Sequence, residues 1–175
     1  MVVRLSKCLL LASIALFFTL IVFNNTTDYN TNYQFVRHVL SMDSTFPGNH
    51  GLWRAIDSSI IQTIFYTGII LWEALTAVLC WWGTIRMLRA LRAPAATFYH
   101  AKRFGIVALT LGMLLWLGAF IVIGGEWFLM WQSRTWNGQG VAFNNFAILG
   151  IVLLYLSVPD TAEAPQKAIP SNRDR

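Results

Sequence analysis

The chain has 175 residues, enough for one domain, and 56% of them are hydrophobic while only 12% are charged. This balance is far from that of an ordinary soluble domain and indicates a membrane protein. The net charge of +5 suggests nucleic-acid binding at first, but the basic residues crowd one short loop between apolar segments. Because no basic face carries stacking aromatics outside a predicted membrane span, we expect no nucleic-acid partner.

The first apolar segment covers residues 5–23 and has Arg4 and Lys7 near its start. A signal peptide is the alternative, but no small-x-small cleavage site follows the segment. At about 1.5 Å per residue, a helix over this range nearly crosses the hydrocarbon core of a bilayer. We therefore predict an uncleaved first helix with its N-terminus in the cytoplasm.

The longest polar stretch, residues 24–58, lacks the basic excess of a cytoplasmic loop and is predicted to lie outside. Within it, Thr31 followed by Gln34 is a capping-box signature for the start of a helix. Apolar residues then recur at helical spacing, namely Phe35, Val36, Val39 and Leu40. This pattern predicts a short amphipathic helix that lies in the membrane interface.

Three further apolar segments, residues 59–82, 104–123 and 141–158, are long enough to span a bilayer. The loop between the first two, residues 83–103, is short and basic, which predicts a cytoplasmic position. The loop at 124–140 contains several tryptophans of the kind that line a membrane interface, and we place it outside.

Together these segments predict an all-α fold, a four-helix transmembrane bundle with a short interfacial amphipathic helix in the first outer loop. Residues 1–158 form one membrane domain, and residues 159–175 form a polar cytoplasmic tail that we expect to be disordered. In the third span, Gly105, Gly112 and Ala119 recur every seven positions. This face is smooth and allows a neighbouring helix to approach closely.

Glu73, near the middle of the second span, is the sharpest candidate for a site. A carboxylate at this depth costs roughly 2.5–3.5 kcal/mol on insertion scales, so it usually faces a partner or a cavity. Counting depth from the helix ends places Ser13 and Tyr155 at a similar level, and a hydrogen bond from either would satisfy the carboxyl. Glu73 is then either a protonatable group in a relay or ligand site, or a neutral acid that joins helices.

Polar residues of the two outer loops form a second candidate group, namely His38, Asp43, His50, Arg54, Glu126 and Arg134. Their spacing matches no known metal-ligand motif, so we expect no metal. An outer cap held by hydrogen bonds and ion pairs is favoured. In such a cap, Glu126 pairs with Arg54 or Arg134.

Several enzyme classes lack their motifs in this chain. No histidine lies within a predicted span, which excludes a four-helix cytochrome with axial histidines. There is no Walker loop, no dinucleotide-binding fingerprint and no nucleophile elbow. The sequence therefore argues against a self-contained enzyme, and we expect no cofactor.

Both outer loops contain motifs rich in aromatic and turn-forming residues, at 25–29, 35–43, 46–49, 124–128, 130–133 and 135–139. These motifs, which include Phe46-Pro47-Gly48-Asn49 and Gly124-Gly125-Glu126-Trp127-Phe128, resemble those of a bacterial family of predicted small integral membrane proteins. That family is catalogued as a domain of unknown function, and Glu73 sits in a matching helix. The resemblance covers nearly the whole chain except the tail. It implies four helices in a bacterial inner membrane and supplies no activity.

The favoured function is a non-enzymatic accessory or binding subunit of an envelope complex, because the outer loops are more elaborate than connections need to be. The alternative is a small transporter, or a quinone- or lipid-handling redox component, with Glu73 as its protonatable group. The expected partners are the lipid bilayer and, beyond it, a membrane or periplasmic protein, a lipid or a quinone. The sequence leaves the ligand, the partner and the oligomeric state open.

Overall fold

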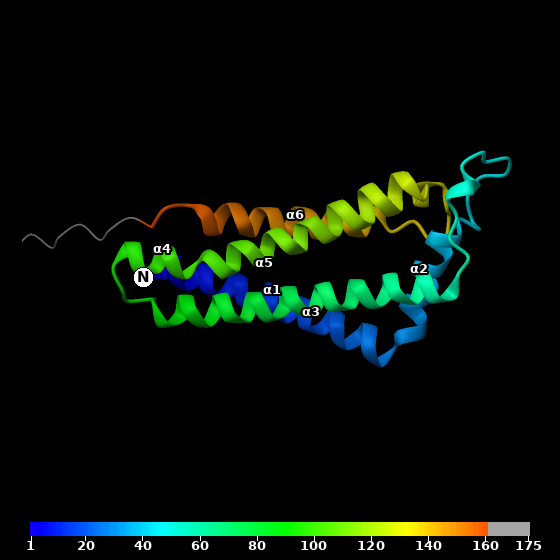
Figure 1. Ribbon diagram of the computed structural model, residues 1–175. Coiled ribbons are helices and arrows are strands. Elements are labelled where there is room, and N and C mark those ends of the chain that lie inside the picture. The colour runs from blue at the N-terminus through cyan, green and yellow to red at the C-terminus, as the bar shows by residue number, and fades with distance from the viewer. Residues whose placement is uncertain (161–175) are drawn as a thin grey trace, which may run out of the picture.

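The computed structural model describes residues 1–160, and most of them are helical. Four long helical segments lie side by side (Figure 1): α1 (Val2–Thr27), α3 (Ser59–Arg89), α5 (Arg103–Leu114) continued by η2 (Leu115–Trp127), and α6 (Gln139–Ser157). The shorter elements are α2 (Tyr29–Ser41), α4 (Ala95–Ala101) and the single turns η1 (Leu52–Arg54) and η3 (Met130–Gln132). The predicted all-α fold is confirmed.

The two ends of the molecule differ in what they contain (Figure 1). The N-terminus, α4 and the end of α6 gather at one end, here called the N-terminal end. Helix α2 and the loops around it lie at the opposite end, here called the α2 end. Of the predicted tail, 159–175, only Pro159 and Asp160 belong to the described residues.

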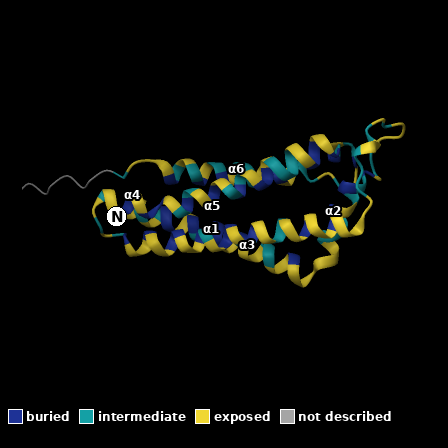
Figure 2. Cartoon of the chain, in the orientation of Figure 1, coloured by how far each residue is buried: buried dark blue, intermediate teal, exposed yellow. Residues whose placement is uncertain are grey.

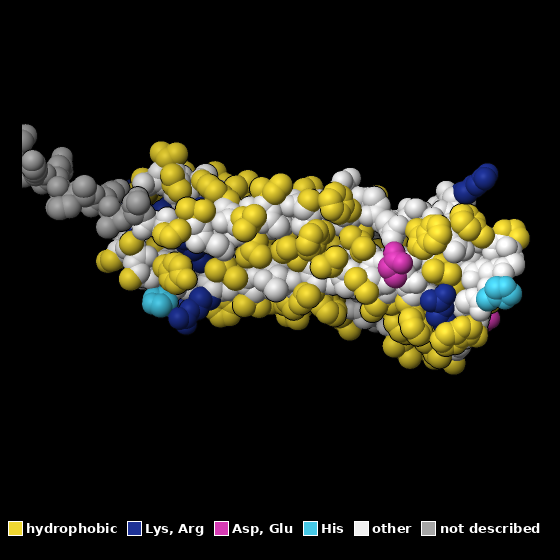
Figure 3. All heavy atoms as spheres, turned by 90° about the horizontal axis from the view of Figure 1, so that it is seen from above, with side chains coloured by type: hydrophobic (Ala, Val, Ile, Leu, Met, Phe, Trp, Pro, Cys, Tyr) yellow, Lys and Arg dark blue, Asp and Glu magenta, His cyan; other side chains and the backbone are white. Residues whose placement is uncertain are grey.

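The middle of the molecule carries a belt of exposed apolar side chains. Each of the four long segments is long and apolar enough to cross a membrane. Leu71, Val78, Ile151 and Leu154 are more than 60% exposed, and Figure 2 shows exposed residues along the outer sides of the helices. In the view of Figure 3, the charged side chains gather toward the two ends and leave the middle apolar. A belt of this size faces lipid, because soluble proteins expose only small apolar patches.

Glycines allow the long helices to pack closely. A Cβ added to Gly83 of α3 would lie 2.7 Å from the backbone nitrogen of Gly105 in α5, so the two backbones almost touch. Leu11 of α1 packs over both glycines. Gly112 in turn accommodates the ring of Phe18. The small-residue face predicted for the third span therefore receives neighbours at Gly105 and Gly112, as expected for helices in lipid.

Helix α3 extends beyond the membrane span predicted at 59–82, and its end helps to fix its level relative to α1. It continues to Arg89, within the more polar extension through Arg92 that the sequence also predicts. Beside it, Nη1 of Arg4 donates hydrogen bonds to the carbonyl oxygens of Leu91 (3.2 Å) and Ala93 (2.6 Å). The first residues of α1 therefore lie level with the residues that follow α3.

The predicted amphipathic helix is present as α2, but its predicted start is wrong. The N-cap is Asp28, because α1 continues to Thr27 and α2 follows it directly. Thr31 lies inside the helix, where its hydroxyl donates to Oδ1 of Asp28 at 2.9 Å. The apolar face packs against α3 and the segment after η2, with Val36, Val39 and Leu40 buried.

The second half of the third span departs from α-helical winding. Residues Leu115–Trp127 form a π-helix, and at its end the backbone N–H of Phe128 donates to the carbonyl of Ile123 at 3.0 Å. π-Helical segments are rare in proteins, and those that occur often lie at functional sites. Here the π-helix carries Trp116 and Phe120, which line the cavity described next.

Candidate functional site

A partly open cavity of about 450 Å³ lies between the long helices near the α2 end. The pair α1–α3 and the pair α5–α6 diverge toward that end, and α2 lies across it (Figure 1). Every spanning segment and α2 contribute to the wall. The wall is largely aromatic and aliphatic, with polar side chains from Asn24, Asn25, Asn32, Tyr66, Glu73 and Asn145. We call this space the Glu73 cavity.

Glu73 lies in the wall of the cavity and is only 2% exposed. The side-chain Nδ2 of Asn25, near the end of α1, donates to Oε2 of Glu73 at 2.7 Å. The hydroxyl of Tyr66, two turns before Glu73 in α3, donates to the backbone oxygen of Asn25 at 3.2 Å. Asn25 is thus held from two sides, and it is the only residue of 1–160 that hydrogen-bonds the Glu73 carboxyl. The rest of that carboxyl's hydrogen-bonding capacity remains available to a ligand.

The predicted hydrogen bonds from Ser13 and Tyr155 to Glu73 are wrong. Ser13 is exposed and donates to the carbonyl of Leu9 at 3.0 Å, while Tyr155 shares a 2.7 Å hydrogen bond with Ser6 at the N-terminal end. The error lies in the predicted position of α1 relative to α3 along the helix axis. Because Asn25 pairs with Glu73, Ser13 lies level with residues near 85, roughly 18 Å away along the helix axis. A functional role for Ser13 and Tyr155 stays a prediction.

A second wall residue, Trp116, has a buried hydrogen-bond donor without a partner in the described chain. Trp116 is 6% exposed, and its Nε1–H has no hydrogen-bond partner among residues 1–160. Its ring packs against that of Phe120, with 4.8 Å between the centroids. A buried donor without a partner costs about 1–3 kcal/mol of stability.

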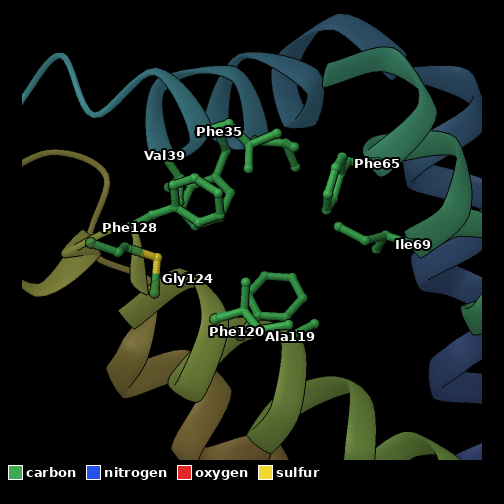
Figure 4. A pocket seen from close by; sticks show the side chains of 12 residues that line it. Phe35, Val39, Phe65, Ile69, Ala119, Phe120, Gly124 and Phe128 are labelled. Atoms are coloured by element: carbon green, nitrogen blue, oxygen red, sulfur yellow. The ribbon is translucent and has the colours of Figure 1, made fainter. Parts of the chain in front are cut away.

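An apolar pocket of about 90 Å³ adjoins the Glu73 cavity (Figure 4). Side chains of α2, α3 and η2 surround it, and the labelled rings of Phe35, Phe65 and Phe120 border the open space. The lining side chains are hydrocarbon apart from the thioether of Met130. Four residues line both spaces, namely Phe35, Val36, Ile69 and Phe120. The two spaces together therefore offer a polar compartment beside an apolar one.

The outer polar group predicted from the sequence comes together only in part. His38 and Asp43 form a pair, with 2.6 Å between Nδ1 and the carboxylate oxygen. The His38 ring also stacks on Trp136, with 4.5 Å between the centroids and 11° between the planes. This cluster ties α2 to the loop before α6.

The other members of the outer group stay apart. His50, Glu126 and Arg134 are exposed, and no ion pair joins Glu126 to Arg54 or Arg134 within residues 1–160. Arg54 instead donates from Nε to the carbonyl of Gly51 at 3.2 Å, and its guanidinium lies 5.4 Å from the centre of the Trp127 ring. Within the described part of the chain, no three His, Cys, Asp or Glu residues lie close enough to hold a metal ion.

The sequence did not predict a charged cluster at the N-terminal end. The buried side chains of Lys7 and Lys102 both form ion pairs with Asp160. Both also donate to the carbonyl of Val158, Lys7 at 2.6 Å and Lys102 at 3.2 Å. Burial opposes ionisation of Asp160, but the hydrogen bonds and charges of the two lysines outweigh it and hold the pKa of that carboxyl below its usual range.

Asn25 is the main residue of the site that the sequence did not reveal. A usable signal exists, because Phe17, Ile21 and the pair Asn24–Asn25 recur at helical spacing and so share one face of α1. This spacing indicates that the apolar stripe of α1 ends in a polar group. The polar stretch that begins at residue 24 predicts a loop and so hides this signal.

One comparison with known proteins returns a match. The family described as "Predicted small integral membrane protein (DUF2165)" matches residues 3–159. No curated protein and no solved structure matches the chain.

Proposed function

The chain belongs to this family of predicted small integral membrane proteins, and on that premise we propose that it binds an amphiphilic molecule of the membrane in the Glu73 cavity. One observation carries the proposal. A buried carboxyl, fixed by a single amide, faces a cavity of about 450 Å³ to which every spanning segment contributes. Ligand sites are typically spaces of this size with apolar walls and a few convergent polar groups.

The cavity chemistry suits a ligand whose polar group both donates and accepts hydrogen bonds. Glu73 accepts a hydrogen bond from a ligand hydroxyl or amine, while Asn25 keeps the carboxyl in one orientation. The side-chain amides of Asn24, Asn32 and Asn145, which also line the wall, donate to a ligand oxygen. The adjoining apolar pocket receives a hydrocarbon portion, because it shares four wall residues with the cavity. A quinol, the reduced form of a quinone, or a lipid with a small, uncharged head group has this chemistry, and Glu73 is then the protonatable group beside it.

Native mass spectrometry of the protein, purified in a mild non-ionic detergent, tests the proposal. We expect the wild type to retain an amphiphile, which solvent extraction and fragmentation then identify. Glu73→Leu should lose this adduct because it removes every polar atom of the side chain. Glu126→Leu, which removes an exposed carboxylate at the α2 end, should keep it. Equal adducts on the wild type and Glu73→Leu would contradict the proposal.

A second candidate function is that of an accessory subunit that meets a partner protein at the α2 end. The observation in its favour is a protruding loop with exposed apolar side chains: Trp53 is 76%, Phe46 52% and Leu52 50% exposed (Figure 1). Affinity purification of the wild type and of Trp53→Ser tests whether a partner protein binds through this loop. A partner that co-purifies only with the wild type supports this function, whereas two lone monomers count against it.

For the orientation, we propose that the N-terminal end lies on the cytoplasmic side of a bacterial inner membrane, and that both termini of the chain are cytoplasmic. Within the described residues, seven Lys and Arg side chains and a single carboxylate, Asp160, belong to the N-terminal end. The α2 end has three arginines and four carboxylates. An excess of basic residues in short loops marks the cytoplasmic side.

A further inference from the structure

A basic pocket of about 480 Å³ lies at the N-terminal end, between the last turns of α3 and the helix α4. Arg86 and Arg89 contribute to it from α3, and Thr97 and His100 contribute from α4. Trp82 forms part of its wall on the side toward the apolar belt. The pocket is separate from the Glu73 cavity and shares no residue with it.

The charge of this pocket is unbalanced within the described chain. Asp160, the one carboxylate of residues 1–160 at this end, forms ion pairs with Lys7 and Lys102. Arg86 and Arg89 form no ion pair within residues 1–160. The guanidinium of Arg86 lies 5.3 Å from the centre of the Phe104 ring, a contact that positions the side chain without neutralising it. Two arginines that converge without a carboxylate are suited to an anion, because guanidinium groups bind phosphate with paired hydrogen bonds.

The surface next to the pocket indicates that this anion belongs to a lipid. An exposed apolar stripe runs along one face of α3 toward the arginines, formed by Leu71, Leu75, Val78, Trp82 and Ile85. These positions recur three and four residues apart, and Arg89 continues the same row. An acyl chain that lies along the stripe brings its phosphate to the level of Arg86 and Arg89.

We propose that this pocket binds the phosphate of an anionic phospholipid. Arg86 and Arg89 hold the phosphate, the Thr97 hydroxyl donates one hydrogen bond to it, and the α3 stripe supports an acyl chain. A zwitterionic lipid is disfavoured, because its ammonium group would lie among basic side chains with no free carboxylate within the described residues. The site is independent of the ligand proposed for the Glu73 cavity.

Lipid titration followed by native mass spectrometry tests this site. The protein in non-ionic detergent is titrated with phosphatidylglycerol or with phosphatidylcholine of the same acyl chains. We expect the wild type to prefer phosphatidylglycerol, and the double variant Arg86→Gln/Arg89→Gln to bind it at least about tenfold more weakly. The matched control, Arg37→Gln/Arg134→Gln, removes the same charge from the α2 end and should change binding less than about twofold.

Two further arms identify the source of the phosphate and protect the result from folding defects. Inorganic phosphate at millimolar concentration should not displace the lipid; if it does, the pocket is a soluble-phosphate site and the lipid assignment fails. Thr97→Val keeps the net charge and should still weaken phosphatidylglycerol binding, while the matched change Thr135→Val at the α2 end should leave it unchanged. Equal affinity for both lipids, or an equal loss in the α2-end control, would overturn the proposal.

Discussion

The hydrogen bond between Asn25 and Glu73 connects α1 to α3 at the wall of the cavity. The two side chains are 8% and 2% exposed, and 2.7 Å separates the donor from the acceptor. If Asn25 alone is removed, a buried carboxyl is left without its partner. If both are removed, only a small interaction is lost, since buried polar pairs often have little net effect.

This argument predicts strong coupling between the two positions. Asn25→Ala should lower the free energy of unfolding by about 1–2 kcal/mol, the range of interhelical hydrogen bonds in membranes and of unsatisfied buried groups. In a Glu73→Leu background, the same change should cost about 0.5 kcal/mol or less, because no carboxyl remains to be satisfied. Denaturant titration in mixed micelles gives the four values. Strict additivity of the two substitutions would show that the bond contributes nothing to the fold.

Asp160 gives the fold a pH-dependent contact at the N-terminal end. Lys7 and Lys102 hold the pKa of its carboxyl below the usual range, against the opposing effect of burial. A group with a lowered native pKa stabilises the fold above its ordinary pKa and loses this effect as the pH falls through the native value. The stabilisation should therefore be complete at neutral pH and vanish in acid.

The measurement is thermal unfolding of the wild type and Asp160→Asn in non-ionic detergent between pH 7 and pH 2. Asp160→Asn should be less stable at pH 7, by an amount that stays constant down to about pH 4. Below that value the two proteins should converge, since the wild-type carboxyl then takes up a proton. A difference that grows in acid would have the wrong sign for this contact.

At the level of elements, the contact between α3 and α5 depends on Gly83. A Cβ at this position meets the backbone nitrogen of Gly105 at 2.7 Å, and backbone cannot move aside as a flexible side chain does. Gly83→Ala should therefore cost about 1–3 kcal/mol, as overpacking does in other cores. Gly68 of the same helix is the matched control, because a Cβ there meets nothing within 4 Å.

Gly68→Ala should be neutral or stabilising by up to about 1 kcal/mol, the difference in helix propensity. Unfolding of both variants in mixed micelles reports the comparison. If the two alanine variants have equal stability, the two backbones do not approach as closely as described.

The elements also mark the limit of what the sequence could predict. Each span follows from a run of apolar residues, a local property, so residues 5–23 and 59–82 fall inside α1 and α3. The level of one helix relative to the next is not local. It depends on contacts between distant segments, such as the hydrogen bonds from Arg4 to the residues after α3. A partner of Glu73 inferred by counting depth from the helix ends was wrong for that reason.

Other functional residues could not be predicted from the sequence, because their roles also depend on contacts between distant segments. In the sequence, Trp116 is one of many aromatic residues in apolar segments. Only its position in a π-helix beside the cavity distinguishes it. Asp160 was assigned to the polar tail, yet two buried lysines from distant segments surround it. Glu73 itself was identified, because a charge within an apolar run is visible without any structure.

At the level of the whole molecule, the proposed orientation predicts which end is accessible from outside the cell. Cys8 and Cys80 are 1% and 0% exposed, so the native chain should react little with a thiol reagent. A membrane-impermeant maleimide should label His50→Cys in intact spheroplasts and should label Ala96→Cys only after permeabilisation. Both positions are exposed, at opposite ends of the molecule. The reverse pattern would place the N-terminal end outside.

The central claim is that the Glu73 cavity holds an amphiphilic ligand, and an experimental density map of the protein in a lipid nanodisc tests it most directly. We predict elongated density in the cavity, with a polar end at about 3 Å from the Glu73 carboxyl and an apolar end toward Phe35 and Phe120. A cavity that contains only ordered water, or that closes when the protein is surrounded by lipid, would contradict the claim.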